Sequence, residues 1–203
     1  MRFGLSDKPS NESAYILRRH VELVTGLVEK LQLKGVTIVG QDWGGPISLR
    51  YAIDHQDNVR SMVILNTMVR MRPIPLLFTL AFRNGGFSSF LIRNLDVFRK
   101  IAFPHGWLFR RPVEASVPEQ YRMPHPDAAS RAGIAAFPKM IPGNSQHPNA
   151  GYISKIDTVL QTWNVPVLVM FSDGDTAFKI AEGQRIADMV PNRRSQVIQN
   201  AGH

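Results

Sequence analysis

The chain has 203 residues, 44% of them hydrophobic, which is enough for one sizeable core but not for several domains. It contains no cysteine, and this excludes a disulfide framework and thiolate metal ligands. No stretch approaches the roughly 20 apolar residues that span a bilayer, and the first nine residues lack the apolar segment of a signal peptide. We therefore expect a cytoplasmic protein with no membrane partner.

The net charge of +8 is concentrated in the middle of the chain. Residues 70–163 contain twelve Lys and Arg against five Asp and Glu, and so carry +7 of the total. A nucleic-acid interface would need a basic face with interleaved aromatic residues or a known motif, whereas these cations are scattered. The pattern predicts a solvated basic lobe that binds no nucleic acid. Such a lobe could also attract anions to a nearby cleft.

The first long element is an amphipathic helix expected over residues 14–33, where apolar residues recur every three or four positions. Ser10 or Asn11 can cap its N-terminus, and Gly35 ends it. His20 is a lone histidine on this helix, and we expect it to have a structural role.

A sharp turn follows. The β-branched run Val36–Val39 predicts a buried strand, and Pro46 indicates the first turn of a helix. Between them, Gly40-Gln41-Asp42-Trp43-Gly44 has the Gly-X-nucleophile-X-Gly spacing of a nucleophile elbow. We expect the two glycines to leave room for the tight turn and Asp42 to adopt a strained backbone conformation. An aspartate stands where esterases have serine.

Alternation of helices and strands after the elbow predicts a mostly parallel sheet with right-handed crossovers. The expected elements are strands at 59–65, 165–171 and 196–198, apolar helical segments at 75–82 and 87–101, and a helix at 180–189. No convincing strand lies between Val69 and Trp163. The sequence thus predicts an α/β core in two parts, residues 1–68 and 164–203, with an inserted helical cap over residues 69–163.

Three titratable residues follow strands of this sheet: Asp42, Asp175 and His203. Sites in open α/β sheets gather at the carboxyl ends of the strands. The order nucleophile, acid, histidine is that of the α/β-hydrolases. Each residue alone could be an ordinary loop residue, but together with the elbow they predict a catalytic triad.

An aspartate nucleophile narrows the chemistry. A carboxylate is already anionic at neutral pH and can displace a leaving group from sp³ carbon, giving an ester that histidine-activated water then hydrolyses. The leaving group is then a halide or an epoxide oxygen, and no cofactor or metal is needed. Trp43 offers an indole N–H suited to a halide, and its backbone N–H is expected to form half of an oxyanion hole.

Gly40-Gln41-Asp42-Trp43-Gly44-Gly45 resembles the haloalkane dehalogenases of the α/β-hydrolase superfamily. The resemblance extends over nearly the whole chain, through segments 3–9, 121–142, 171–175 and 201–203. It implies hydrolysis of small halogenated substrates by water to an alcohol and a halide, through an aspartyl ester. It also implies that Asp42 is the nucleophile, Asp175 the acid, His203 the base and Trp43 one halide-stabilising residue.

Two departures from the family pattern stand out. Members with a similar cap place a second halide donor, a tryptophan, early in the cap, where residues 69–103 have phenylalanines but no tryptophan. Trp107, Asn84 and Asn94 are the candidates for this role, whereas Trp163 is expected to pack. A complete member also has further strands before this chain, with a His-Gly loop, and a helix after it. We therefore expect the chain to be the middle of a domain.

Two other functions remain open. Epoxide hydrolases share the Asp-Trp elbow and the ester chemistry, but usually have histidine at the position of Gln41 and use two cap tyrosines, for which Tyr121 and Tyr152 are candidates. Alternatively, the chain is an inactive, truncated hydrolase-like protein with an interaction role. The sequence leaves the oligomeric state undetermined.

Overall fold

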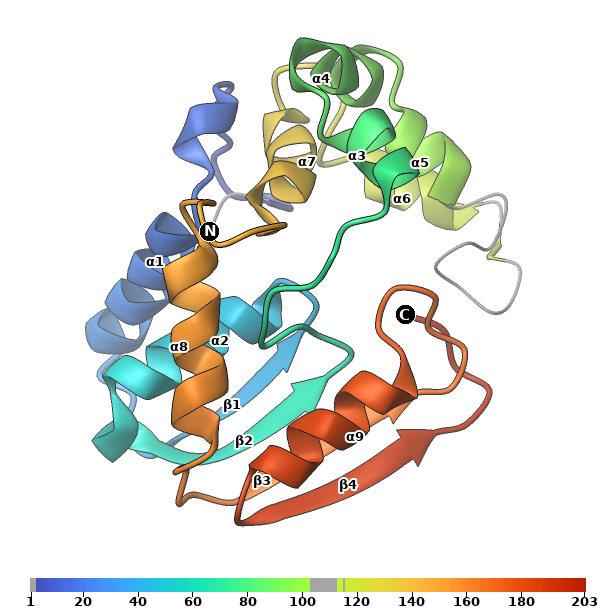
Figure 1. Ribbon diagram of the computed structural model, residues 1–203. Coiled ribbons are helices and arrows are strands. Elements are labelled where there is room, and N and C mark those ends of the chain that lie inside the picture. The colour runs from blue at the N-terminus through green and yellow to red at the C-terminus, as the bar shows by residue number, and fades with distance from the viewer. Residues whose placement is uncertain (1–2, 103–112, 115) are drawn as a thin grey trace.

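The computed structural model describes residues 3–102, 113–114 and 116–203. Its centre is a parallel four-stranded sheet in the order β1-β2-β3-β4 (Figure 1). The strands are β1 (Val36–Gln41), β2 (Val59–Leu65), β3 (Val167–Ser172) and β4 (Arg193–Ile198). The expected α/β-hydrolase sheet is confirmed. The bounds of β2 are those predicted from the sequence, while β4 begins three residues earlier than expected.

The register aligns the carboxyl ends of all four strands. Gln41 pairs with Leu65, Leu65 with Met170, and Ser172 with Ile198. The residues that directly follow the strands therefore meet at one edge of the sheet, which we call the catalytic edge.

One face of the sheet is covered by α2 (Gly44–Asp54) and α9 (Ile180–Met189), with α8 (Ala150–Leu160) packed on α2 (Figure 1). The helix α1 (Leu17–Lys30) also packs against α2. None of the described helices is long and apolar enough to cross a membrane.

The start of α1 differs from the expectation. The sequence favoured one helix from residue 14, but the backbone of Ile16 is extended and separates α1 from a short 3₁₀ helix, η1 (Glu12–Ala14). Asn11 caps η1 by accepting a hydrogen bond from the Ser13 amide at 3.0 Å. His20 is buried on α1 and packs its ring against Phe137 at 5.0 Å, as expected for a structural histidine.

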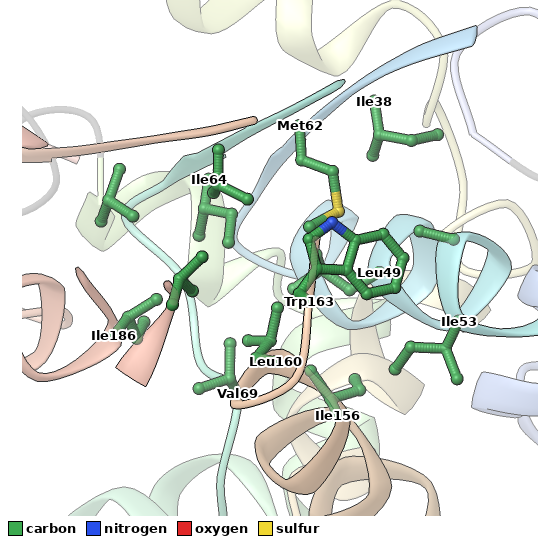
Figure 2. Packing of buried hydrophobic residues seen from close by; sticks show 14 of the residues in the cluster. Ile38, Leu49, Ile53, Met62, Ile64, Val69, Ile156, Leu160, Trp163 and Ile186 are labelled. Carbon is green, nitrogen blue, oxygen red and sulfur yellow. The ribbon is translucent and has the colours of Figure 1, made fainter. Parts of the chain in front are cut away.

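The main core lies between the sheet and α2, α8 and α9. Figure 2 shows Trp163 and Met62 among the apolar side chains of this cluster. Trp163 is 3% exposed, which confirms that it packs. The helix α8 lies inside the range predicted for the cap, yet Ile153, Ile156 and Leu160 of α8 belong to this main core. The division of the chain at residues 69 and 163 stays a prediction.

The segment between β2 and α8 forms a helical lobe beside the catalytic edge (Figure 1). Its elements are α3 (Leu76–Phe82), α4 (Gly85–Asn94), α5 (Val97–Ala102), α6 (Ser116–Arg122), α7 (Ala132–Ala136) and η3 (Phe137–Met140). The described residues of the lobe contain no strand. The prediction of one helical segment over residues 87–101 was wrong, because Asp96 adopts a left-handed conformation, φ 54°, between α4 and α5.

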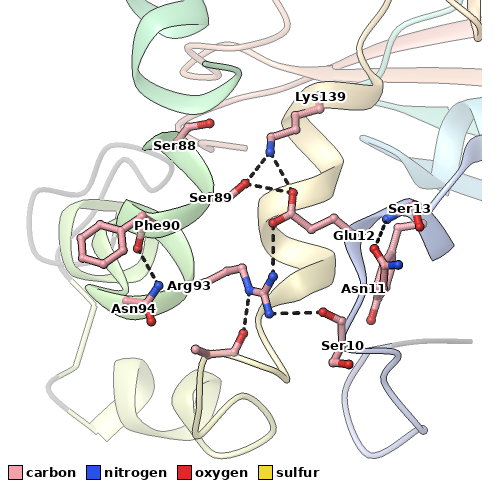
Figure 3. Close-up of polar contacts among 12 residues, drawn as sticks. Ser10, Asn11, Glu12, Ser13, Ser88, Ser89, Phe90, Arg93, Asn94 and Lys139 are labelled. Carbon is pink, nitrogen blue, oxygen red and sulfur yellow. Dashed lines mark hydrogen bonds and ion pairs between the residues drawn. The ribbon is translucent and has the colours of Figure 1, made fainter. Parts of the chain in front are cut away.

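Polar side chains hold the lobe in place. Figure 3 shows a cluster that we call the Glu12 clamp, consisting of Glu12, Ser89, Arg93 and Lys139. The carboxylate of Glu12 accepts from Lys139 Nζ at 2.8 Å and from Ser89 Oγ at 3.0 Å, and it lies 3.5 Å from Arg93 Nη1. The clamp joins η1, α4 and η3.

Arginines fasten the lobe from inside as well. Arg131 is only 8% exposed and donates to the carbonyls of Arg93, His125 and Pro126. Arg83 donates to the carbonyl of Ile141 at 2.9 Å. The expectation of a solvated basic lobe was therefore wrong for these side chains, because backbone carbonyls take the place of water as their partners.

Candidate active site

Asp42 directly follows β1 and precedes α2, at the turn that the motif predicted. Its φ of 47° lies in the left-handed region, which is costly for a residue with a Cβ. Three bonds hold this backbone: the Asp42 amide donates to the Asn66 carbonyl at 3.0 Å, and the Asp42 carbonyl accepts from Thr67 Oγ1 at 2.6 Å and the Gly45 amide at 3.0 Å. The expected strained conformation is confirmed.

The glycines of the elbow differ in what they allow. A Cβ on Gly40 would lie 2.5 Å from Ser48 Oγ, and a Cβ on Gly45 would lie 2.0 Å from Thr67 Oγ1. A Cβ on Gly44 would meet nothing within 4 Å. The expectation that both motif glycines make room for the turn holds for Gly40 and is wrong for Gly44. The second close approach falls one residue later, at Gly45.

Asp42, Asp175 and His203 meet at the catalytic edge. His203 bridges the two carboxylates: its Nδ1 lies 2.8 Å from Asp175 Oδ2 and its Nε2 lies 3.2 Å from Asp42 Oδ2. Asp175 is 1% exposed, whereas the side chain of Asp42 is 45% exposed. A buried carboxylate thus orients the imidazole on one side, and a carboxylate that is accessible to solvent lies on the other.

This arrangement shifts two pKa values. The hydrogen bond that His203 donates to Asp175, followed by the one that it donates to Asp42, raises the pKa of His203 to about 9, although burial opposes the change. Burial pushes the pKa of Asp175 upward, but hydrogen bonds from His203 and from the amides of Phe178 and Ala177 outweigh it and hold that pKa below its usual value. In the resting protein the imidazole is therefore protonated at neutral pH between two carboxylates.

Sequence reasoning missed the residues that support the triad. The buried Asn66, which directly follows β2, donates from Nδ2 to Asp175 Oδ2 at 2.6 Å and accepts from the Ser172 amide at 2.9 Å. Ser172 Oγ donates to the Gly202 carbonyl at 2.5 Å, next to His203. The signal was available, because Asn66 and Thr67 follow a strand of the same parallel sheet as Asp42.

Trp43 occupies the N-cap position of α2, and its ring packs edge-on against Phe137 of η3, with 5.4 Å between the ring centroids. Of the three candidates for a second halide donor, the structure describes the two asparagines, and none of their hydrogen bonds joins Trp43. Asn84 is exposed, Asn94 donates to the carbonyl of Phe90 on its own helix, and Trp107 lies outside the described residues. Among the described residues, neither asparagine makes a hydrogen bond to the triad.

Comparison with known proteins identifies the family of the chain. The family of the alpha/beta hydrolase fold matches residues 2–203, and the chain belongs to it. Within that family its relatives include haloalkane dehalogenase 1 of Mycobacterium tuberculosis, 34% identical over 188 residues that make up 91% of this chain and 59% of the relative.

Two further matches are a solved structure and a second curated relative. The crystal structure of the haloalkane dehalogenase DatA from Agrobacterium tumefaciens superposes with a TM-score of 0.86 at 23% identity, covering 98% of this chain and 70% of that one. A cis-3-alkyl-4-alkyloxetan-2-one decarboxylase of Shewanella oneidensis is 28% identical over 207 residues, 98% of this chain and 64% of the relative. The chain thus spans about three fifths of the curated relatives it matches.

Proposed function

We propose that the protein hydrolyses small haloalkanes to an alcohol and a halide through an ester on Asp42, with His203 as the base and Asp175 as the acid that orients it. The observation that carries this proposal is the single imidazole between two unlike carboxylates, 2.8 Å from the buried one and 3.2 Å from the accessible one. An esterase of this fold would have a hydroxyl at the elbow in place of Asp42.

In the first step, a carboxylate oxygen of Asp42 attacks the carbon that bears the halogen. A carbon–oxygen bond forms while the carbon–halogen bond breaks, and the electron pair leaves with the halide. The indole N–H of Trp43 supports the departing halide. This step requires no proton transfer, so a protonated His203 does not impede it.

In the second step, water gives a proton to His203 while its oxygen attacks the carbonyl carbon of the ester. The bond from that carbon to the alkyl oxygen then breaks, the alcohol leaves with a proton from the imidazolium, and the restored Asp42 ionises again. Formation of the ester removes the negative charge of Asp42, and with it one of the two hydrogen bonds that raise the pKa of His203. The imidazole then loses its proton more readily and can serve as the base at this step. The backbone N–H of Trp43, at the start of α2, is the proposed oxyanion donor.

The test is release of bromide from 1,2-dibromoethane and 1-bromobutane, beside formation of diol from styrene oxide. We expect bromide from the 203-residue chain and none from Asp42→Ala, with Asp57→Ala as the control because Asp57 is exposed in the 3₁₀ helix Gln56–Asn58. His203→Gln should stop after one turnover and leave an alkyl adduct on Asp42 that mass spectrometry detects. Intact protein without that adduct would contradict the ester mechanism.

Diol without bromide would instead identify an epoxide hydrolase. The tyrosines considered for that function offer it little support. Tyr152 lies on α8 beneath the guanidinium of Arg50 of α2, 4.7 Å from the ring centroid, and Tyr121 of α6 is 57% exposed. No activity towards either substrate class would leave two interpretations, the hydrolase-like interaction protein and the oxetan-2-one reaction described next.

A second candidate is the opening of a 3,4-dialkyl oxetan-2-one, the substrate in the name of the Shewanella relative. The absence of a tryptophan from residues 69–103 favours it, because this leaving group is a carboxylate within the substrate and requires no halide site. Asp42 would attack the saturated ring carbon that is bonded to the ring oxygen, and the bond between that carbon and the ring oxygen would break. Loss of CO₂ from the freed carboxylate would then form an alkene and release Asp42. Because this reaction consumes no water, His203→Gln should keep making alkene, whereas it should stop dehalogenation.

A further inference from the structure

Arg72 lies in the segment between β2 and α3 and reaches the turn that follows Asp175. Two independent contacts join them. Arg72 Nη1 donates to the Ala177 carbonyl at 2.5 Å, and the guanidinium carbon lies 4.7 Å from the ring centroid of Phe178. A flat guanidinium group can donate a hydrogen bond in its plane and stack its face on a ring at the same time. The ammonium group of a lysine offers only a point charge.

The same turn supports the acid and the histidine together. The amides of Ala177 and Phe178 donate to Asp175 Oδ1 at 2.6 and 2.9 Å. The ring of Phe178, which is 4% exposed, stacks on the imidazole of His203 with 5.5 Å between centroids and 29° between planes. Displacement of this turn would therefore move the carboxylate that orients the imidazole and the ring that packs on it.

We propose that Arg72 is a positioning residue for the histidine-dependent step: it holds residues 177 and 178 so that Phe178 and Asp175 keep the His203 imidazole aligned. The kinetic part of this inference rests on the proposed ester mechanism. Arg72 makes no hydrogen bond to Asp42 or Trp43 among the described residues, so the alkylation step should not depend on it.

The kinetic test compares Arg72→Met and Arg72→Lys with the matched control Arg70→Met. Arg70 stands two residues earlier in the same segment, and its side chain is 50% exposed, 3.6 Å from Glu182 of α9. In rapid-mixing experiments with 1,2-dibromoethane, we expect both Arg72 variants to release the first equivalent of bromide at the wild-type rate. Hydrolysis of the ester should slow by roughly ten- to a hundredfold, as for a misplaced catalytic group. Arg70→Met should behave as the wild type.

Equal slowing of both steps would overturn the proposal, because it would assign Arg72 to substrate binding or to the fold as a whole. So would unchanged hydrolysis in both Arg72 variants. If Arg72→Met does not fold, Arg72→Lys decides the outcome, since it keeps the charge and can still donate to the Ala177 carbonyl without stacking on Phe178.

A second readout needs no turnover. The His203 ring protons in an NMR spectrum carry the ring-current shift of the stacked Phe178, and Phe178→Leu reports the spectrum without that ring. We expect Arg72→Met to move these signals part of the way towards those of Phe178→Leu, and Arg70→Met to leave them in place. Wild-type protein that releases no bromide would sink the proposed function alone. Unmoved His203 signals in Arg72→Met would sink the role of Arg72.

Discussion

The catalytic edge and the helical lobe hold their polar side chains by different means. At the edge, parallel strands in register place Asp42 and Asn66 directly after β1 and β2, and Asp175 follows β3 by three residues. Hydrogen bonds then join Asn66 to both aspartates. In the lobe, charged side chains such as Arg131 and Lys139 reach across to carbonyl groups and carboxylates of other segments. Backbone geometry defines the first region, and side-chain contacts define the second.

This difference predicts unequal responses to pH, and the largest expected effect lies at the edge. The pKa of His203 is raised from about 6.5 to about 9, so its contribution to stability is complete below pH 6.5 and is lost as the pH rises through about 9. We expect the free energy of unfolding to fall by up to roughly 3 kcal/mol across that range. Urea denaturation at pH 6.5 and pH 9.5 measures it.

Two variants separate this effect from other titrations. Asp42→Asn removes one of the carboxylates that raise the pKa of His203 and should shrink the pH dependence. His203→Gln should remove most of it. If the free energy of unfolding of His203→Gln fell with pH as steeply as that of the wild type, other titrating groups would be the cause of the pH dependence. Because the lobe pairs carboxylates with Arg and Lys, which stay charged over this range, it should contribute little.

The next effect tests whether the catalytic edge depends on the buried side-chain amide of Asn66. Asn66→Leu is similar in size but removes the donor to Asp175 and the acceptor for the Ser172 amide. Leaving buried groups without partners costs about 2–3 kcal/mol here, since one of them is a carboxylate. We expect that loss in urea denaturation, together with slower ester hydrolysis. The matched control is Asn144→Leu in an exposed turn of the lobe, which should lose less than about 1 kcal/mol.

Much of the edge could be predicted from the sequence, and the reason is physical. A β-branched run, two glycines and a proline specify a strand, a turn and a helix from local contacts, so these residues alone are enough to place Asp42 at the turn. The parallel register then follows from helix–strand alternation, which gathers the residues after each strand. Asn66 and Thr67 obeyed the same rule and were missed because neither titrates.

The lobe could be predicted only as helical and inserted. At its break, the Asp96 carboxylate lies 2.6 Å from Arg99 Nε and 3.9 Å from Arg131 Nε, and Arg131 is 35 residues away in the sequence. The Glu12 clamp joins residues 127 positions apart, and no periodicity in the sequence signals such a contact. For the same reason the charge surplus of residues 70–163 did not reveal which arginines face solvent and which bind carbonyls.

The third test concerns the glycines of the elbow, with an expected change of about 2 kcal/mol in the free energy of unfolding. Gly45→Ala places a methyl group 2.0 Å from Thr67 Oγ1 and should lower the free energy of unfolding by that amount, because Thr67 must move and weaken its bond to Asp42. Gly44→Ala meets no atom within 4 Å and begins α2, so it should be neutral or slightly stabilising. Equal losses in the two variants would refute the assignment of the tight contact to Gly45.

The smallest effect belongs to the lobe. Glu12→Gln removes the negative charge that Lys139 and Arg93 share. The charged side chains of the clamp remain 20–28% exposed, so we expect a loss of only about 1 kcal/mol. Glu22→Gln is the control, because Glu22 pairs with Arg18 and Arg19 on the exposed side of α1 and should cost less still. Lys139 lies two residues after Phe137, whose ring packs on Trp43. Glu12→Gln should therefore also raise KM for a bromoalkane about twofold while Glu22→Gln leaves it unchanged.

A fall in the free energy of unfolding of Glu12→Gln as large as that of Asn66→Leu would show that the lobe is held as firmly as the catalytic edge, and the contrast between the two regions would not stand.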